Sequence, residues 1–255
     1  MRLNLFNIFK AELNKYWIEI KTYYPDHIVN IIVTYIFFTG FFLGFRNNSM
    51  IDDSYYIGFL YWFFVSNVIS EASVSISFEK QIGTLEQLIL KPVSLEVICL
   101  VKTLVWLMIT SIKAIILLLI IKLTLPINIV FDIKVVPILI ITLTGLLGFS
   151  LLLAGLTLRF TKTASFESIL SYILLFFTGA IVNIDNMPKL VRFISKTLPL
   201  TNGILISQRL INNESVSISQ IFSLCLNSLL YLVVGILLFK YINKKSKTEG
   251  IYNEY

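Results

Sequence analysis

Six long runs of apolar residues, separated by short polar segments, dominate the pattern of the chain. Each run has about 20 residues, the length that an α-helix needs to cross the hydrocarbon core of a bilayer. The runs are continuously apolar instead of alternating, which favours helices over a membrane barrel. We therefore predict one all-α integral membrane domain over residues 1–255, with six transmembrane helices. The predicted spans cover residues 28–45, 55–76, 97–121, 135–158, 168–184 and 218–241.

The first polar segment, residues 1–26, predicts a helix that lies along the membrane surface. Its apolar residues, among them Phe6, Leu13 and Trp17, recur at helical spacing with charged residues interleaved. This pattern is typical of an amphipathic helix in the cytoplasmic interface, with the tryptophan ring at headgroup depth.

The segment before the last predicted span, residues 185–217, mixes apolar clusters with helix-breaking residues. Pro188 and Pro199 divide it into short pieces. We expect one or two short re-entrant helices that dip into the outer leaflet. A plain extracellular loop is the alternative.

Small residues within the spans have more than one interpretation. Gly145, Gly148 and Gly155 in the fourth span either let two helices approach closely or are simply tolerated in a membrane helix. Cys99 and Cys225 lie in apolar stretches, where they behave as small hydrophobic residues. We expect neither a disulfide framework nor a metal site from them.

The polar segment between the second and third spans, residues 77–94, has the signals of a short independent helix. Thr84, with Gln87 three residues later, has the capping-box pattern. The glycine just before Thr84 lets the chain turn out of the second span. Pro92 ends the helix, because the residue before a proline avoids the helical conformation. The predicted helix covers residues 85–90.

This short helix carries an apolar face, because Leu85, Leu88 and Ile89 share one side at helical spacing. Two destinations for this face remain open. It packs on the inner leaflet or the ends of neighbouring spans, or it fills a groove on a cytosolic partner, with charged residues such as Glu79 and Glu86 as a polar rim.

Composition and charge set the class of protein and the orientation. With 56% hydrophobic and only 14% charged residues, the chain has no polar segment long enough for a soluble domain. Most of its Lys and Arg residues fall on the cytoplasmic side when the N-terminus is placed inside. Both termini are therefore predicted to be cytoplasmic. The net charge of +6 follows from this asymmetry and requires no nucleic-acid partner.

Two segments resemble the ABC-2 type transporter permeases, the membrane subunits of bacterial ABC exporters. Residues 79–94, EKQIGTLEQLILKPVS, are similar to the cytoplasmic loop of that family. Residues 187–203 are more weakly similar to its proline-marked loop before the last span, although Asn202-Gly203 stand where family members often carry an aromatic residue. The interfacial helix and the six-span layout also match, so the resemblance covers nearly the whole chain.

The resemblance implies a function and a set of partners. It implies that residues 84–91 form a coupling helix seated in a cleft of a separate ATPase subunit, which holds ATP and magnesium, while this chain binds no cofactor. It further implies a second permease copy, identical or not, in the bacterial plasma membrane among its lipids. The complex would export an amphipathic or lipophilic drug, peptide or lipid-linked molecule by alternating access. The implied coupling residues are Glu79, Gly83, Thr84, Leu85, Glu86, Gln87, Leu88, Ile89 and Pro92.

The chain shows no catalytic chemistry of its own in its sequence. It lacks the GxxxxGK[ST] pattern of a phosphate-binding loop, so we expect ATP hydrolysis on another polypeptide. No metal-ligand spacing and no nucleophile elbow occur in it. The single histidine, His27, is expected to be an interfacial polar residue.

Lys113 is the polar residue that most needs a partner, because the sequence places it midway along the third span. It pairs with a carboxylate, Glu71 being the candidate, or it faces an aqueous substrate path. Together with Phe38, Phe41 and Phe176 it forms our predicted path, although lipid-facing phenylalanine is the more common arrangement. Two rival functions remain: a membrane-embedded enzyme that modifies a lipid with Lys113 and Glu71, and an ATP-independent channel or scaffold.

Overall fold

The computed structural model describes residues 5–46, 54–127, 129–130, 132–160, 164–182 and 184–249. These residues form helices joined by turns and short connections, with no strand among them, which confirms the all-α prediction. Within them, five helices are long and apolar enough to cross a membrane. They are α2 (Tyr24–Arg46), α3 (Tyr55–Gln81), α5 (Leu95–Thr124), α6 (Val135–Arg159) and α10 (Ile218–Glu249).

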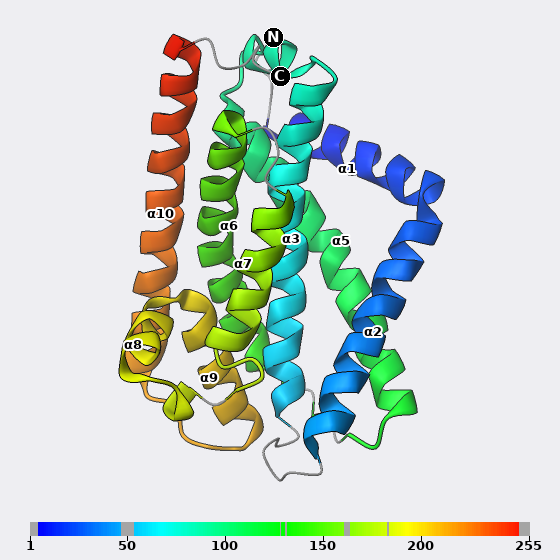
Figure 1. Cartoon of the computed structure of the whole chain (residues 1–255), viewed down its shortest axis with the longest axis vertical. Helices are drawn as coiled ribbons and strands as arrows, with labels where there is room; N and C mark the ends of the chain where they lie inside the picture. The colour runs from blue at the N-terminus through cyan, green and yellow to red at the C-terminus, as the bar shows by residue number, and fades with distance from the viewer. Residues whose placement is uncertain are drawn as a thin grey trace.

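The shorter elements cover the two ends and one side of this bundle (Figure 1). At the end drawn uppermost are α1 (Leu5–Thr22) and α4 (Leu85–Ile89), and near the opposite end are α8 (Lys189–Thr197) and α9 (Pro199–Ile211). The helix α7 (Ala164–Phe177) runs between the two ends, and a short 3₁₀ turn, Ile184–Asn186, follows it.

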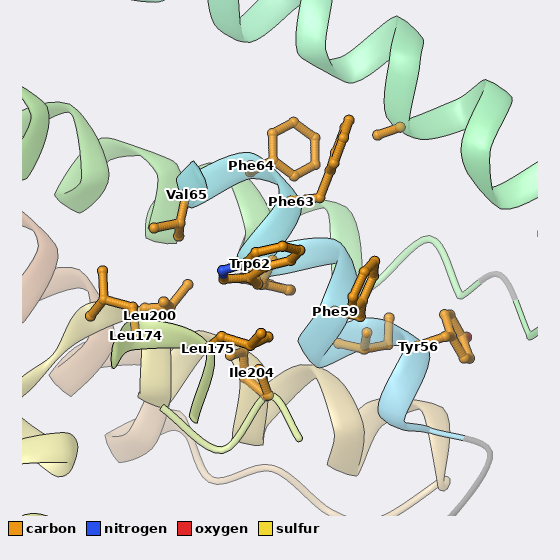
Figure 2. Close-up of a cluster of buried hydrophobic side chains, with 14 of the residues drawn as sticks. Tyr56, Phe59, Trp62, Phe63, Phe64, Val65, Leu174, Leu175, Leu200 and Ile204 are labelled. Atoms are coloured by element: carbon orange, nitrogen blue, oxygen red, sulfur yellow. The ribbon is translucent and has the colours of Figure 1, made fainter. Parts of the chain in front are cut away.

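The most buried of the long helices is α3. In α3, 67% of the apolar stretch is buried, whereas in α2 only 11% is buried. The helix α3 is therefore at the centre of the bundle, and α2 lies on its flank. Aromatic side chains of α3 supply much of the core: Tyr56, Phe59, Trp62, Phe63 and Phe64. In Figure 2 Trp62 lies on the side of α3 that faces Leu174 and Leu175 of α7 and Leu200 and Ile204 of α9, whereas Phe63 and Phe64 point away from them.

Glycines bring α6 and α10 into direct backbone contact. A Cβ atom built on Gly148 would lie 2.1 Å from the carbonyl oxygen of Tyr231, and one on Gly235 would lie 2.0 Å from that of Gly148. The glycines therefore let two helices approach closely, which was the first of the two interpretations of the sequence. Gly145 is close to Ser228 and Gly155 to Phe239, so the two helices run in the same direction.

The predicted fifth span, residues 168–184, is not a single long helix. The helix α7 ends at Phe177, and its 14 residues are about 21 Å long, less than the roughly 30 Å of a hydrocarbon core. The left-handed conformation of Gly179 (φ +85°) stops the helix. Since α6 and α10 are parallel, the chain must nevertheless return between them, and it does so through α7 and the segment that carries α8 and α9.

The segment over residues 185–217 contains two helices, as the proline positions predicted. Pro199 starts α9, and the buried side chains of this helix include Leu200, Ile204 and Ile206. By contrast, α8 exposes Leu190, Phe193 and Ile194. The segment is therefore not a plain loop, while the predicted entry into the outer leaflet stays a prediction.

Three helices are longer at the α4 end than their apolar runs predicted. The helix α3 continues to Gln81, α5 starts at Leu95, and α10 continues to Glu249. With 30 residues, α5 is about 45 Å long and exceeds the thickness of a hydrocarbon core by about 15 Å. The extensions of α3 and α5 hold α4 beyond the level of α1.

The predicted helix in the N-terminal segment is confirmed, and its position in the membrane interface stays a prediction. α1 turns its Tyr16 onto α5, where Val105, Trp106 and Ile109 surround it. The predicted interfacial face, with Phe6 and Trp17, is exposed, which is the surface that a membrane-lying helix needs. After Thr22, one residue separates α1 from α2.

Candidate functional site

The turns on either side of α4 fix the path of the chain at the α3–α5 junction. Gly83 takes a left-handed conformation (φ +73°), which glycine adopts without steric cost, and α4 begins two residues later. The predicted capping box is wrong. The backbone of Thr84 is helical and its hydroxyl caps no amide of α4. That hydroxyl instead donates a hydrogen bond to the Glu79 carboxylate.

The apolar face of α4 packs on the chain itself. Leu85 and Leu88 are 2% and 8% exposed, in a cluster with Ile76, Leu158 and Phe239 of the neighbouring helices. Ile89 is half-buried at the edge of the same cluster. Of the two destinations that the sequence left open, the structure shows the one within the chain, so these leucines fix α4 on the bundle.

The opposite side of α4 and its flanking turns is open. Ile82 is 52% exposed and Leu90 84% exposed, and Glu86 and Gln87 are exposed on the helix itself. Pro92 is exposed as well. The predicted coupling residues thus form two groups. Leu85 and Leu88 are buried and hold the helix on the bundle, whereas Glu86, Gln87 and Pro92 are exposed.

Glu79 connects α4 to two other helices. Its carboxylate lies 3.1 Å from the Lys102 ammonium of α5 and 3.6 Å from the Lys15 ammonium of α1. Lys102 also donates to the Ser75 hydroxyl at 3.0 Å. Glu79 has cations on two sides and the Thr84 hydroxyl on another, so its charge is well compensated.

Lys80 makes a further connection, to α6. Its ammonium donates a hydrogen bond of 3.3 Å to the carbonyl oxygen of Leu158, one residue before the end of that helix. A cation at a helix C-terminus is favourable, because the last carbonyl groups have no amide partner. The α4 junction is therefore held by polar contacts to α1, α5 and α6.

The role of Lys102 was missed in the sequence, where it counted only as a cytoplasmic charge. One signal was available, since Lys102 falls inside the predicted span 97–121 and a lysine there needs a partner. Nothing in the sequence connects Lys15 to Glu79, which are 64 positions apart and meet only because α1 folds back over α5.

A second candidate site is a polar cavity of about 450 Å³ among α1, α2, α3, α5 and α7. We call it the polar cavity. Its walls include Asn30 and Thr34 of α2, Asn67 and Ser70 of α3, and Trp106 of α5. A space of this size is large enough for a drug-sized molecule.

Lys113 lines the polar cavity, and its ammonium points toward Trp106. Its ammonium lies 4.8 Å from the centre of the Trp106 ring, and that ring lies 6.0 Å from the ring of His27 in the first turn of α2. The Lys113 side chain therefore points back along α5 toward the level at which α2 begins, while its backbone lies seven residues beyond Trp106 near the middle of α5. Its depth in a membrane stays a prediction.

Glu71 also lines the cavity, and its partner is a tyrosine instead of Lys113. The Tyr16 hydroxyl of α1 donates a 2.5 Å hydrogen bond to the Glu71 carboxylate. Burial, followed by the nearby Glu71 charge, raises the pKa of Tyr16 well above its ordinary range, so this hydroxyl keeps its proton. Glu71 and Lys113 are not in ion-pair contact in the described part of the chain.

The predicted path residues fall into a continuous aromatic group next to the cavity. Phe41 and Phe176 are 6.2 Å apart between ring centres, and Phe37 joins Phe41 to Trp62. Trp62 is a wall residue of the polar cavity. Phe38 is buried and packs on Phe59 of α3. Phe38 and Phe41 are thus packed against other rings, and a role of these residues in transport stays a prediction.

No group of three potential metal ligands occurs in the described part of the chain. Five long apolar helices around a buried core define a multi-pass α-helical membrane protein. The family model of the ABC-2 type transporter matches residues 4–211, so this chain belongs to the ABC-2 type transporter family. The resemblance seen in the sequence is confirmed, and the chain is a transport component of the membrane. No match to a curated protein was found.

Proposed function

We propose that the chain is the permease subunit of an ATP-driven exporter in the bacterial plasma membrane. It pairs with a second permease, identical or not, and with two separate ATPase subunits. When ATP closes the ATPase subunits, the coupling helices move with them, and the permease alternates between inward-facing and outward-facing states. Its cargo is an amphipathic or lipophilic molecule.

The arrangement of α4 is the observation that carries this proposal. The helix stands at the tip of the extended α3 and α5, and Glu79 and Lys80 connect its base to three other helices. Its outer side presents the exposed side chains of Ile82 and Leu90. A helix held in this way transmits a force on its outer side to the bundle instead of bending away.

The outer side of α4 is also suited to a protein partner. Large exposed apolar side chains with polar neighbours are typical of the centre and rim of a docking surface. We therefore assign contact with the ATPase to Ile82, Glu86, Gln87 and Leu90. Leu85 and Leu88 hold the helix from behind.

The same geometry supports an orientation in the membrane. The end of α10 carries Lys244, Lys245 and Lys247 and lies with α1 at the α4 end of the bundle (Figure 1). Basic residues collect on the cytoplasmic side of a membrane protein, so we place this end, with both termini, in the cytoplasm. The segment of α7, α8 and α9 then supplies the sixth crossing.

The test is capture of the ATPase by the full-length permease, purified in mild detergent from its native host. We expect a protein with the GxxxxGK[ST] sequence and ATPase activity to copurify with the wild type, and at least tenfold less of it with Leu90→Ser. The matched control is Leu123→Ser, because Leu123 is equally exposed (85%) at the other end of α5. The proposal fails if no such ATPase is captured, or if Leu90→Ser and Leu123→Ser retain it equally.

A further inference from the structure

The polar cavity has a strong excess of acidic side chains. Four carboxylic acids line it, Glu19, Asp26, Glu71 and Glu167, against the single lysine, Lys113. They come from four different helices and converge on one space. Such an excess disfavours an anionic ligand and attracts a cation, because a cleft lined by charges of one sign concentrates the opposite sign.

The charges and the rings occupy different depths. Asp26 and Glu167 belong to the first turns of α2 and α7, and Glu19 lies near the end of α1. Trp62 lies nine residues before Glu71 on α3, which is about 13 Å along the helix axis, and Tyr172 stacks on Trp62 with ring centres 6.3 Å apart. The cavity therefore has an acidic mouth near α1 and an aromatic far end, where Trp62 is buried and Tyr172 is half-exposed.

Several polar atoms around this cavity have no hydrogen-bond partner among the residues that the structure describes. They are the indole nitrogen of Trp106, the Ser171 hydroxyl and Nε2 of His27. Trp106 and Ser171 are only 8% and 7% exposed, and both line the cavity. An unsatisfied buried polar group costs about 1–3 kcal/mol, so native proteins rarely leave such groups together without a ligand or water.

We propose that the polar cavity is a binding site for a cationic amphipathic molecule, which names the cargo class of the proposed exporter and rests on that function. The carboxylates at the mouth hold the cationic group. Trp62 and Tyr172 pack on its apolar body, and aromatic faces also attract cations that approach them. The Trp106 indole N–H donates to an oxygen of the same molecule. The mouth opens at the α4 end, so the molecule enters from the cytoplasmic side.

Two ions of the same shape and opposite charge test this proposal. Tetraphenylphosphonium is a lipophilic cation, and tetraphenylborate is its anionic counterpart of nearly equal size. Equilibrium binding of each ion is measured on the full chain in nanodiscs, with empty nanodiscs subtracted. We expect saturable binding of the cation and none of the anion. Equal binding of both ions, or no saturable binding of the cation, overturns the proposal.

The carboxylates at the mouth supply the decisive variant. Glu19→Gln together with Asp26→Asn keeps shape and removes charge, and we expect about tenfold weaker binding of tetraphenylphosphonium. The control is Glu214→Gln, because Glu214 is exposed and lies outside the cavity, where it pairs with Arg209. An unchanged affinity in the double variant, whose folding is checked by gel filtration, would also overturn the proposal.

Tryptophan fluorescence places the bound cation. The chain has three tryptophans, two of which, Trp62 and Trp106, line the cavity, whereas Trp17 is 56% exposed on α1. Binding should change the emission of the wild type and of Trp17→Phe, and a response lost in Trp17→Phe would place the ion elsewhere. Because no ATPase takes part, capture of the ATPase without cation binding counts against the site alone. Cation binding without capture counts against the exporter alone.

Discussion

Glu79 of α3 and Lys102 of α5 form a buried ion pair, with 3.1 Å between carboxylate and ammonium and side-chain exposures of only 11% and 6%. Lys15 approaches the same carboxylate from α1, with a side chain that is 51% exposed. The Glu79 carboxylate thus has one buried cation and one solvated cation as partners. Loss of the buried contact should lower the free energy of unfolding far more than loss of the solvated one.

Lys102→Met should destabilise the protein severely. It leaves Glu79 largely buried without its nearer cation, and breaking a buried pair in this way costs about 3–5 kcal/mol. Lys15→Met is the matched control, since a solvated pair contributes about 1 kcal/mol or less. Thermal unfolding of both variants in detergent measures the difference. Equal melting temperatures for the two variants would show that the buried pair does not stabilise the junction.

Leu85→Ala and Leu90→Ala should separate stability from partner binding. Leu85 is buried, and its truncation costs about 2–5 kcal/mol. Leu90 is 84% exposed, so its truncation changes stability by at most about 0.5 kcal/mol. Cys99 lies in the same cluster as Leu85, and its labelling by a thiol-reactive dye on heating, in a Cys225→Ser background, reports the loss. Early labelling in Leu90→Ala would contradict the assignment of the two faces.

The burial of Tyr16 beside the Glu71 carboxylate predicts a dependence of stability on alkaline pH. The pKa of Tyr16 is raised in the folded state above its ordinary value of about 10. The unfolded chain therefore loses this proton first, and stability falls as the pH rises above 10, by at most about 1.4 kcal/mol per pH unit. Tyr16→Phe should weaken this slope between pH 10 and 11, measured by unfolding. Tyr23→Phe, at an exposed site, should keep it.

Gly148→Leu should force α6 and α10 apart. Even a Cβ atom at this position would lie 2.1 Å from a backbone oxygen of α10, which no change of side-chain rotamer relieves. Overpacking usually costs about 1–3 kcal/mol, and here the strain falls on two backbones. Gly40→Ala is the control, because nothing lies within 4 Å of the Cβ that it adds. A wild-type melting temperature for Gly148→Leu would contradict the close contact.

The sequence predicted most helices, since continuous apolar runs have few other solutions in a membrane. The prediction of the fifth span was wrong, because a single residue sets the backbone conformation there. Residues 168–184 are mostly apolar, but Gly179 adopts a left-handed conformation and stops the helix at Phe177. Hydropathy does not register such a backbone change.

The direction of the Lys113 side chain could not be predicted for a related reason. An apolar run gives the length of a helix, but not which neighbours its polar side chains meet. The Lys113 ammonium lies against Trp106, which contacts His27 from a helix more than 70 positions away. The capping box failed because the Thr84 hydroxyl donates to the Glu79 carboxylate and accepts no hydrogen bond from an amide of α4. The contact of His27 with Trp106 is long-range and leaves no local signal in the sequence.

The backbone contact of Gly148 with Gly235 has a mechanical consequence. No side chain lies between α6 and α10 at that point, so a change of rotamer cannot let one helix slide past the other. We therefore expect the two helices to move as one rigid unit. Any rearrangement of the bundle is then taken up where packing is sparse. The flank helix α2 has the least buried apolar stretch of the long helices, 11%, so we expect it to move most when the bundle rearranges.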